Sequence, residues 1–318
     1  MKDFSEFTLS MIQNLEEEGR FGTAHVYRST LKAFTHYWQK KYPKTSISLK
    51  AAFTPATLKD FERHLQERML KLNTLSTYMR MLRAIYHRAL NREFVLYVPA
   101  LFDHVYTGTR ADVKRALPVA DMGRVLDTTN PCGQELEEVR IWFALLFLLR
   151  GMPFADLARL RKCDMQDGVI TYRRQKTGRP LTVQLTKEAA ELIQHCADRC
   201  PESPYLLDIL WKNDVPSHAP IGSREEYRHY QNVLRSFNRK LKKLATALGI
   251  GMGFSSYTAR HTWATTAFHQ KCAIGIISNA LGHSSVKVTE TYLKPFENDV
   301  LDKTNKKIIS YVKKVVAV

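Results

Sequence analysis

Three side chains near the C-terminal end could together carry out chemistry on a phosphate group. They are Arg260 in the run T-A-R-H, His283 in the tripeptide L-G-H, and Tyr292 nine residues further on in T-E-T-Y-L. A tyrosine hydroxyl can attack phosphorus without a metal ion if cationic side chains stabilise the charge that develops. The planar fork of Arg260 can hold two phosphate oxygens at once, and a histidine can donate a hydrogen bond or carry a proton. Because a free tyrosine has a pKa of about 10, the surrounding groups must help to remove its proton.

Each of these residues also has an ordinary structural explanation. Tyr292 could be a packed aromatic side chain on a short C-terminal helix, and His283 could cap a helix after Gly282. Arg260 could be a surface arginine in the first turn of a helix, although a cation is mildly unfavourable there because of the helix dipole. His261, next to Arg260, is expected to support the fold rather than to contact phosphate. The three residue types at this spacing together favour the chemical interpretation.

The order of these motifs resembles the C-terminal half of the tyrosine recombinase (phage integrase) family, whose pattern is H-x-x-R-H, then L-G-H, then a nucleophilic tyrosine. The resemblance implies that Tyr292 is the nucleophile, that Arg260 is the second arginine of the pattern and that His283 is its L-G-H histidine. The combination of R-G-M-x-F-x-D-L with Y-x-A-R-H-x-W-A-T also looks like the integrase subgroup common in Bacteroidetes. The reaction implied is DNA strand cleavage through a covalent phosphotyrosine.

Lys176 lies in the basic segment Y-R-R-Q-K-T-G-R-P-L, at the tip of a predicted β-hairpin. It resembles the family's hairpin lysine, which implies that it is the general acid for the leaving oxygen. A lysine suits this task better than an arginine, because its pKa falls readily beside other cations. The neighbours Arg173, Arg174 and Arg179 leave open a hairpin that is merely basic and faces DNA.

Two positions depart from the family pattern. The family's first arginine belongs to G-L-R-x-x-E-L, and aligning Gly151 and Asp156 with its glycine and acid puts Pro153 in the arginine's place. Arg150 lies three positions earlier, just before the helix that Pro153 is expected to begin, and could reach the phosphate from that turn. A capping role or a salt bridge with Asp156 is the alternative for Arg150. Lesser substitutes for the missing arginine are Arg159, Arg161 and Arg173.

The second departure is Tyr257, which stands where the family has its first histidine. A phenol can donate a hydrogen bond to a phosphate oxygen, but it is a poor proton shuttle near neutral pH. No metal and no cofactor is expected in this site. The candidate catalytic residues are therefore Tyr292, Arg260, His283, Lys176, Arg150 and Tyr257.

The composition favours a nucleic acid as partner. Lysine and arginine total 48 against 31 for aspartate and glutamate, which gives a net charge of +17 in a chain of 318 residues. Such an excess favours a polyanion, with nucleic acid ahead of membrane, although a merely basic globular protein stays open. No signal peptide is visible. The strongest apolar run, 141–149, is about half a membrane span, so it is expected to be a buried helix and no membrane partner is predicted.

Five scattered cysteines suit reduced thiols, and therefore a cytoplasmic protein. His195, Cys196 and Cys200 could suggest a metal site. No second ligand pair lies near them in sequence, so no structural zinc is expected.

Periodicity divides the chain into a helical part and a mixed part. In the first hundred residues apolar side chains recur at helical spacing, Thr54-Pro55 is a helix start, and basic residues occupy the polar faces. This pattern predicts a bundle of about four helices. Beyond the basic segment 108–116 and apart from an irregular stretch, 201–222, the expected helices are 119–126, 135–149, 187–199 and 225–248, and the expected strands are 169–174 and 181–185.

The predicted fold class is mainly α with a small β-hairpin or sheet. The resemblance implies a SAM-like helical core-binding domain over 1–107, a linker over 108–116 and a mixed α+β tyrosine recombinase catalytic domain over 117–305. The tail, 306–318, carries apolar residues that an exchange between neighbouring protomers would need, and a helix docked on its own subunit is the alternative. These apolar residues are Ile308, Ile309, Tyr311 and Val312.

The function implied is site-specific DNA recombination, that is, integration, excision or inversion through a 3′-phosphotyrosine and a Holliday junction, without metal or ATP. The partners implied are double-stranded DNA, a homotetramer on paired sites and accessory DNA-bending proteins. No additional arm-binding domain is visible at the N-terminus, which favours an invertase or a mobile-element enzyme with compact sites. Two alternatives stay open: a type IB topoisomerase-like nicking-closing enzyme, and a DNA-binding protein that has lost catalysis, which Pro153 and Tyr257 would explain.

Overall fold

The computed structural model describes residues 2–110, 115–129, 131–211, 219–293, 302–303 and 305–310. Contacts divide the chain into two compact units, Met1–Asp112 with Ala219–Tyr227, and Val113–His218 with Arg228–Val318. Each unit has its own hydrophobic core. Within the predicted linker, 108–116, residues 111–114 lie outside the described part of the chain, so the linker stays a prediction.

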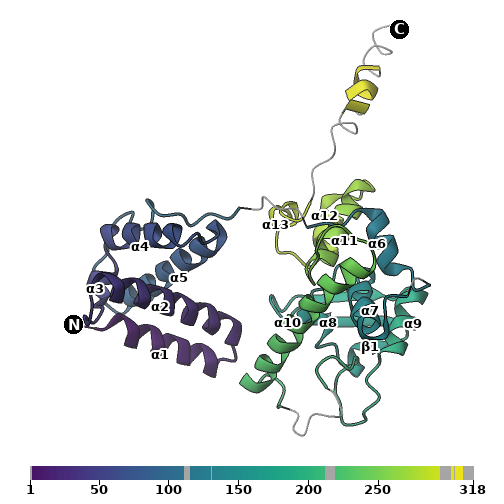
Figure 1. Ribbon diagram of the computed structural model, residues 1–318, viewed down its shortest axis with the longest axis horizontal. Coiled ribbons are helices and arrows are strands. Elements are labelled where there is room, and N and C mark those ends of the chain that lie inside the picture. The colour runs from purple at the N-terminus through teal and green to yellow at the C-terminus, as the bar shows by residue number, and fades with distance from the viewer. Residues whose placement is uncertain are drawn as a thin grey trace. The chain divides into compact units, whose positions relative to one another are not determined.

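The first unit is built from helices, as the periodicity predicts (Figure 1). Thr54 begins one of them as expected, because its side chain accepts a hydrogen bond from the Thr57 backbone N–H ahead of Pro55. A one-turn helix accompanies the four long ones that the sequence predicts. The helices are α1 (Phe4–Glu17), α2 (Phe21–Lys41), α3 (Leu49–Ala52), α4 (Pro55–Glu67) and α5 (Leu72–Asn91).

Aromatic rings hold the core of the first unit together. Phe4, Phe34 and Phe61 are fully buried, and the Phe34 and Phe61 rings meet edge-on with centroids 5.0 Å apart. Such a pair contributes about 0.5–1.5 kcal/mol beyond the burial of its surface. On α5, Arg80 and Arg88 are exposed, so basic side chains lie on the outside of the bundle.

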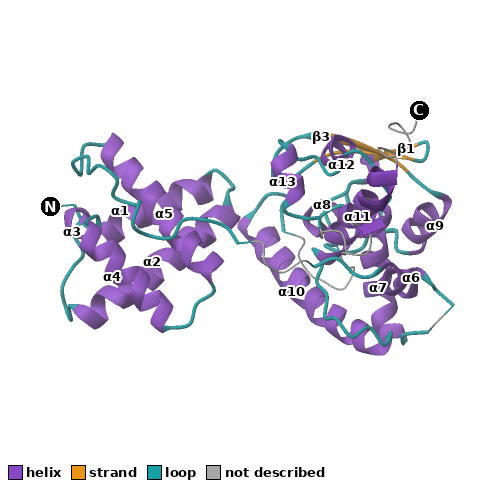
Figure 2. Cartoon of the chain, turned by 90° about the horizontal axis from the view of Figure 1, so that it is seen from above, coloured by secondary structure: helices purple, strands orange, loops and turns teal. Residues whose placement is uncertain are grey.

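The second unit combines helices with a small antiparallel sheet, so the predicted fold class is confirmed (Figure 2). Its strands follow the order β1-β2-β3, and Ile170 of β2 faces Val183 of β3. The strands are β1 (Met165–Gln166), β2 (Val169–Arg173) and β3 (Pro180–Gln184). The helices are α6 (Val119–Leu126), α7 (Gln134–Leu148), α8 (Phe154–Leu157), α9 (Lys187–His195), α10 (Arg224–Ala247), α11 (Thr258–His269), α12 (Ile274–Ala280) and α13 (Val286–Glu290). Residues 224–227 of α10 belong to the first unit.

Helix α7 is the buried centre of the second unit, in agreement with the apolar run at 141–149. Trp142 of this helix lies 5.8 Å, ring centroid to ring centroid, from Phe237 of α10. Phe237 in turn stacks on Phe154 of the short helix α8 at 4.4 Å. Through these rings α8 is fixed to the core, and with it Asp156, a residue that matters for the site.

No described helix combines the length and the apolar character that crossing a membrane requires. All five cysteines carry free thiols. In the part of the chain that the structure describes, no three His, Cys, Asp or Glu side chains gather closely enough to hold a metal ion.

Candidate active site

Tyr292 lies in a cage of rings just after α13, where the structure brings four of the predicted site residues together. Its ring stacks on the His283 ring at 5.0 Å and lies 6.0 Å from the Tyr257 ring. The guanidinium carbon of Arg260 is 5.5 Å from the centre of the same ring. His261 packs on it from another side, with centroids 4.7 Å apart.

Helix α11 fixes the position of the tyrosine backbone. The Tyr292 carbonyl oxygen accepts a hydrogen bond from the Thr265 hydroxyl at 3.2 Å and lies 3.3 Å from Nδ1 of His261. Both partners come from α11, the helix that also carries Arg260. His261 is thus placed to orient the segment that bears the hydroxyl, which is the supporting role expected from the sequence.

Arg260 is buried, with 2 % of its surface exposed, and is therefore no surface arginine. Its Nη1 donates to the Gly151 carbonyl oxygen at 2.8 Å, and its Nη2 donates to the Leu281 carbonyl oxygen at 2.5 Å and lies 2.9 Å from Nε2 of His283. Burial, and then the neighbouring charge of Arg174, lower the pKa of Arg260 from its ordinary value. A guanidinium nevertheless keeps its charge in proteins, so the site holds a buried cation.

His283 is held in one tautomer by its two ring contacts. Because a guanidinium can only donate, Nε2 of His283 accepts from Arg260, and Nδ1 therefore carries the proton and donates to the Thr289 hydroxyl at 2.8 Å. Burial, followed by the charges of nearby cations, lowers the pKa of His283 to about 3. The cations are Arg260, Arg174, Lys176 and Arg179. The imidazole is neutral at pH 7.

The Tyr292 hydroxyl forms a hydrogen bond with the Tyr257 hydroxyl, 3.1 Å between the oxygens. Burial raises the pKa of Tyr292, the bond with Tyr257 raises it further, and Arg260 lowers it. The net direction is upward, so Tyr292 is protonated near neutral pH. Tyr257 thus contacts the predicted nucleophile, whereas the sequence suggests a contact with phosphate.

Two glycines allow the backbone to pass close to the cations of the site. Gly151 has a φ of +68°, and a Cβ added there would lie 3.0 Å from the Arg260 Cα. Gly282 has a φ of +66°, and its added Cβ would lie 2.8 Å from the Cδ of Arg174 and 2.9 Å from a methyl carbon of Leu181. A side chain at either position would be strained by the left-handed backbone and by the contact.

The β2–β3 hairpin is tied to the turn that carries His283, and Figure 2 shows its strands beside α12. Where β2 passes into the turn of the hairpin, Nη1 of Arg174 donates to the Leu281 and Gly282 carbonyl oxygens, both at 3.1 Å. On the other arm, Arg179 donates to the His283 carbonyl oxygen and, at 3.0 Å, to Oδ1 of Asn279.

Lys176 lies in the exposed turn between the two strands of this hairpin. Its charge is close enough to lower the pKa of His283. Lys176 is thus carried by a hairpin whose turn Arg174 and Arg179 tie to the segment around His283, and its role as general acid stays a prediction.

Arg174 is the residue of this site that the sequence did not single out. It is buried, with 5 % of its surface exposed, and its Nε lies 3.5 Å from Oδ2 of Asp156. The other oxygen of Asp156 accepts from the Gln175 backbone N–H at 2.9 Å. Burial raises the pKa of Asp156, while the Gln175 N–H and Arg174 lower it. The strand alternation contained a usable signal, since Ile170, Tyr172 and Arg174 fall on one face and all three are buried.

Arg150 lies at the start of the turn that Gly151 continues, with a φ of +58° that is unusual for a residue with a side chain. Its Nη1 donates to the Thr182 carbonyl oxygen of β3 at 3.2 Å. The salt bridge with Asp156 that the sequence allowed as an alternative is made by Arg174 instead. A catalytic role for Arg150 stays a prediction.

Three other arginines could substitute for the family's missing first arginine, namely Arg159, Arg161 and Arg173. They line a hollow of about 510 Å³ on the outer side of the hairpin. Arg159 stands over the Tyr230 ring at 4.3 Å, and Arg173 donates to the Gly178 carbonyl oxygen at 3.2 Å. Arg161 lines the same hollow together with Gln175 and two carboxylates, Asp156 and Asp164. Because Asp156 also contacts Arg174, the hollow adjoins the site.

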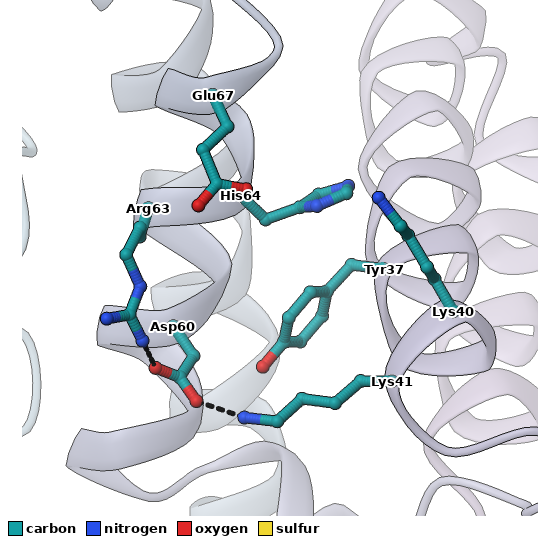
Figure 3. A pocket seen from close by; sticks show the side chains of 7 residues that line it. All are labelled: Tyr37, Lys40, Lys41, Asp60, Arg63, His64 and Glu67. Atoms are coloured by element: carbon teal, nitrogen blue, oxygen red, sulfur yellow. Dashed lines mark hydrogen bonds and ion pairs between the residues drawn. The ribbon is translucent and has the colours of Figure 1, made fainter.

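A smaller hollow of about 280 Å³ lies between α2 and α4 of the first unit (Figure 3). Asp60 binds both Lys41 and Arg63 there, and the Tyr37 hydroxyl is directed toward this group. The hollow is lined by Tyr37, Lys40, Lys41, Asp60, Arg63, His64 and Glu67. Because carboxylates neutralise much of its charge, it has the character of an ion-pair network and not of a catalytic centre.

Comparison with protein families shows which family the chain belongs to. The phage integrase family matches residues 116–299, and the phage integrase SAM-like domain matches residues 3–102. The chain therefore belongs to the phage integrase family. The SAM-like domain followed by an integrase catalytic domain, which the sequence predicts, is confirmed.

Two tyrosine recombinases are distant relatives of this chain. A tyrosine recombinase of Pseudothermotoga lettingae is 24% identical over 158 residues, which are 49% of this chain and 49% of that protein. Tyrosine recombinase XerA of Thermococcus kodakarensis is 25% identical over 189 residues, 58% of this chain and 57% of that protein. The match thus spans about half the length of these relatives.

Solved structures share the fold. A lambda integrase (75–356) dimer bound to a COC′ core site has a TM-score of 0.63 at 15% identity, covering 92% of this chain and 95% of that one. The Tn1549 transposon integrase in complex with transposon right end DNA has a TM-score of 0.63 at 14% identity, covering 97% and 100%. At such low identity, these similarities establish the fold alone.

Proposed function

We propose that this protein is a site-specific DNA recombinase that cuts and rejoins DNA through a tyrosine. One observation carries the proposal: the Tyr292 hydroxyl, the buried Arg260 guanidinium and the neutral His283 ring lie in one cluster within the second unit. This is the set of groups that attack on a phosphodiester needs, namely a nucleophile, a fixed cation and a group that can exchange protons.

In the cleavage step the Tyr292 oxygen attacks the scissile phosphorus and the bond from phosphorus to the 5′ oxygen breaks. The products are a 3′-phosphotyrosine and a strand with a free 5′ hydroxyl. The tyrosine loses one proton and the leaving oxygen gains one, so the phosphodiester charge is the same before and after. The bond energy is kept in the phosphotyrosine, and the reverse attack by a 5′ hydroxyl restores the DNA without ATP.

The route of the Tyr292 proton depends on the hydrogen bonding and the protonation of the His283 ring. In the present structure its Nε2 is occupied by Arg260, and neighbouring cations hold its pKa low. A bound phosphate would draw the Arg260 donors to its own oxygens and would raise the pKa of the imidazole by its negative charge. Nε2 is then free to take the proton of Tyr292, which lies against the same ring. Lys176 on the hairpin supplies the proton to the leaving 5′ oxygen.

Duplex DNA suits the charge of the chain. The net charge is +17, Arg80 and Arg88 are exposed on α5, and three arginines line the hollow beside the hairpin. Lysine and arginine on such surfaces bind phosphates and release counterions, which makes affinity dependent on salt. The same fold is found in a lambda integrase tetramer bound to a Holliday junction, at a TM-score of 0.59, 15% identity, and coverage of 86% of this chain and 72% of that one.

Recombination between two sites also requires several protomers. We propose a homotetramer on paired sites in which the tail, 306–318, is exchanged between neighbours, with accessory DNA-bending proteins where the sites need them. Ile308 and Ile309 are 57% and 45% exposed, as such a segment would require, whereas Tyr311 and Val312 lie outside the described residues. We further propose that the DNA it moves is a mobile element and that it acts in the cytoplasm.

A substrate with a nick close to the cleavage position tests the proposal, because the short released strand diffuses away and traps the covalent product. Inverted repeats beside the coding sequence supply the sites to try. We expect a covalent complex with wild-type protein and strand exchange between two sites. Relaxation of supercoils without exchange would indicate a topoisomerase. Specific binding without any covalent complex would indicate a DNA-binding protein that has lost catalysis.

A further inference from the structure

We propose that Arg174 is a catalytic residue that binds the scissile phosphate together with Arg260, an inference that rests on the proposed function. The residue directly follows β2 and continues the alternation that buries Tyr172. Two guanidinium groups would then hold the non-bridging oxygens while Tyr292 attacks and the 5′ oxygen leaves. No bond of Arg174 changes in the reaction, and its function is to stabilise the charge that develops on the phosphate.

Geometry places the two guanidinium groups side by side. Nη1 of Arg174 and Nη2 of Arg260 donate to the same acceptor, the Leu281 carbonyl oxygen, at 3.1 and 2.5 Å. One carbonyl oxygen can accept from two donors only if both groups lie within hydrogen-bond distance of it. The charge of Arg174 is accordingly the strongest neighbouring charge on Arg260.

The charges of this cluster do not balance. Arg174 and Arg260 are both buried, and the carboxylate that faces Arg174 is Asp156. His283 contributes no negative charge, because it is a neutral imidazole at pH 7. Two buried cations beside each other repel, and burial of unpaired charge is costly. A phosphodiester carries one negative charge and accepts hydrogen bonds on two free oxygens, so it supplies what this cluster lacks.

Arg174 also has donor nitrogens that make no hydrogen bond with the residues that the structure describes. Its Nη1 is used by the turn, whereas its Nε is buried without a hydrogen bond and only 3.5 Å from Oδ2 of Asp156. Among the residues that the structure describes, Nη2 of Arg174 has no hydrogen-bond partner. A planar guanidinium with a spare edge is the group that binds a phosphate through parallel hydrogen bonds.

A purely structural function for Arg174 is the competing explanation, because its Nη1 also holds the turn before His283. The two functions differ in what they require of the substrate. An arginine that binds a charged non-bridging oxygen contributes little to the cleavage rate when that oxygen carries no charge. A residue that merely holds the turn is needed whatever the substrate.

The test uses two nicked substrates, one with a normal scissile phosphate and one with a neutral methylphosphonate at that position. Each is incubated with the full-length wild type and with Arg174→Ala, Arg174→Lys and Arg150→Ala, the last of these representing the competing candidate. Lys187→Gln is the control, because the side chain of this lysine is 91% exposed on α9, where it pairs with Glu191. Single-turnover cleavage rates and DNA affinity are measured for every pair.

We expect Arg174→Ala to lower the rate on the phosphate substrate by about 10²–10³-fold, as loss of one donor to a developing oxyanion does. Arg174→Lys should recover part of the rate, since a point charge replaces the fork. On the methylphosphonate the deficit of Arg174→Ala should shrink to less than about a tenth of its size, with DNA affinity little changed.

An equal deficit on both substrates would overturn the inference in favour of the structural function, and so would a larger deficit for Arg150→Ala than for Arg174→Ala. Failure of the wild type to form any covalent complex refutes the proposed function instead, so the two failures are distinguishable. If Arg174→Ala does not fold, Arg174→Lys on the two substrates gives the same comparison.

Discussion

The closest backbone approach in the site is at Gly282, and Gly282→Ala is the change that tests it. An added Cβ would lie 2.8 Å from the Cδ of Arg174 and 2.9 Å from a methyl carbon of Leu181. Real Cβ atoms essentially never come so close to another heavy atom. The Arg174 stem is held by bonds at its far end, to the Leu281 and Gly282 carbonyl oxygens, so it has little freedom to move aside.

Two costs add at this position. A residue with a Cβ in the left-handed region, here at a φ of +66°, costs about 1–2 kcal/mol. Overpacking of a buried contact costs about 1–3 kcal/mol more. Gly249, with a φ of +64° and nothing within 4 Å of an added Cβ, isolates the first cost. We therefore expect Gly249→Ala to lose about 1–2 kcal/mol of unfolding free energy and Gly282→Ala to lose about 2–5 kcal/mol.

Urea unfolding followed by tryptophan fluorescence measures both variants, and the nicked substrate measures their cleavage. Gly282→Ala should remain folded and bind DNA, yet cleave about 10²-fold more slowly, because a displacement of about 1 Å in a reacting group has that effect. Gly249→Ala should cleave at the wild-type rate. A Gly282→Ala protein that is no less stable than Gly249→Ala, and that cleaves normally, would refute the packing of Gly282 against Arg174.

Three further predictions concern proton transfer. Tyr257→Phe removes a bond that raises the pKa of Tyr292, so the alkaline rise of its pH–rate profile should move to lower pH; a shift to higher pH would contradict this assignment. Burial lowers the pKa of His283 from 6.5 to about 3, so the unfolded chain binds a proton in that window that the folded one does not, and stability should fall as pH drops from 6.5 toward 3. His283→Gln should show a shallower fall over the same range, measured by urea unfolding at each pH, and an unchanged slope would speak against a neutral buried imidazole. Lys176→Ala should be slow on the normal substrate but nearly as fast as wild type when sulfur replaces the leaving 5′ oxygen, because a thiolate leaves without an acid; an equal deficit on both substrates would exclude Lys176 as the acid.

Local sequence patterns were sufficient to predict most of the secondary structure. The helix start at Thr54-Pro55, the buried run that became α7 and the hairpin around Lys176 all follow from short-range signals. Strand β1 was missed, because its two residues, Met165–Gln166, are too few to show an alternation.

The site was less accessible from sequence, because its geometry depends on contacts between distant segments. Arg174 looked like one of several basic residues on a hairpin. Its burial is decided by a turn at Leu281 and Gly282 and by a carboxylate at Asp156, neither of which lies near it in the chain. Arg150 had the better position in the sequence, three residues before Pro153. Its left-handed backbone and the bond to Thr182 could be known only from the folded chain.

The central claim is that Tyr292 is the nucleophile. Because the Tyr257 hydroxyl lies only 3.1 Å from the Tyr292 hydroxyl, the experiment must distinguish these two tyrosines. The most direct measurement is to trap the covalent complex on the nicked substrate, digest it and identify the peptide that carries the nucleotide by mass spectrometry. We expect the adduct on Tyr292 in the wild type and in Tyr257→Phe, and no adduct in Tyr292→Phe. An adduct on Tyr257, or one that survives Tyr292→Phe at the wild-type level, would contradict the claim.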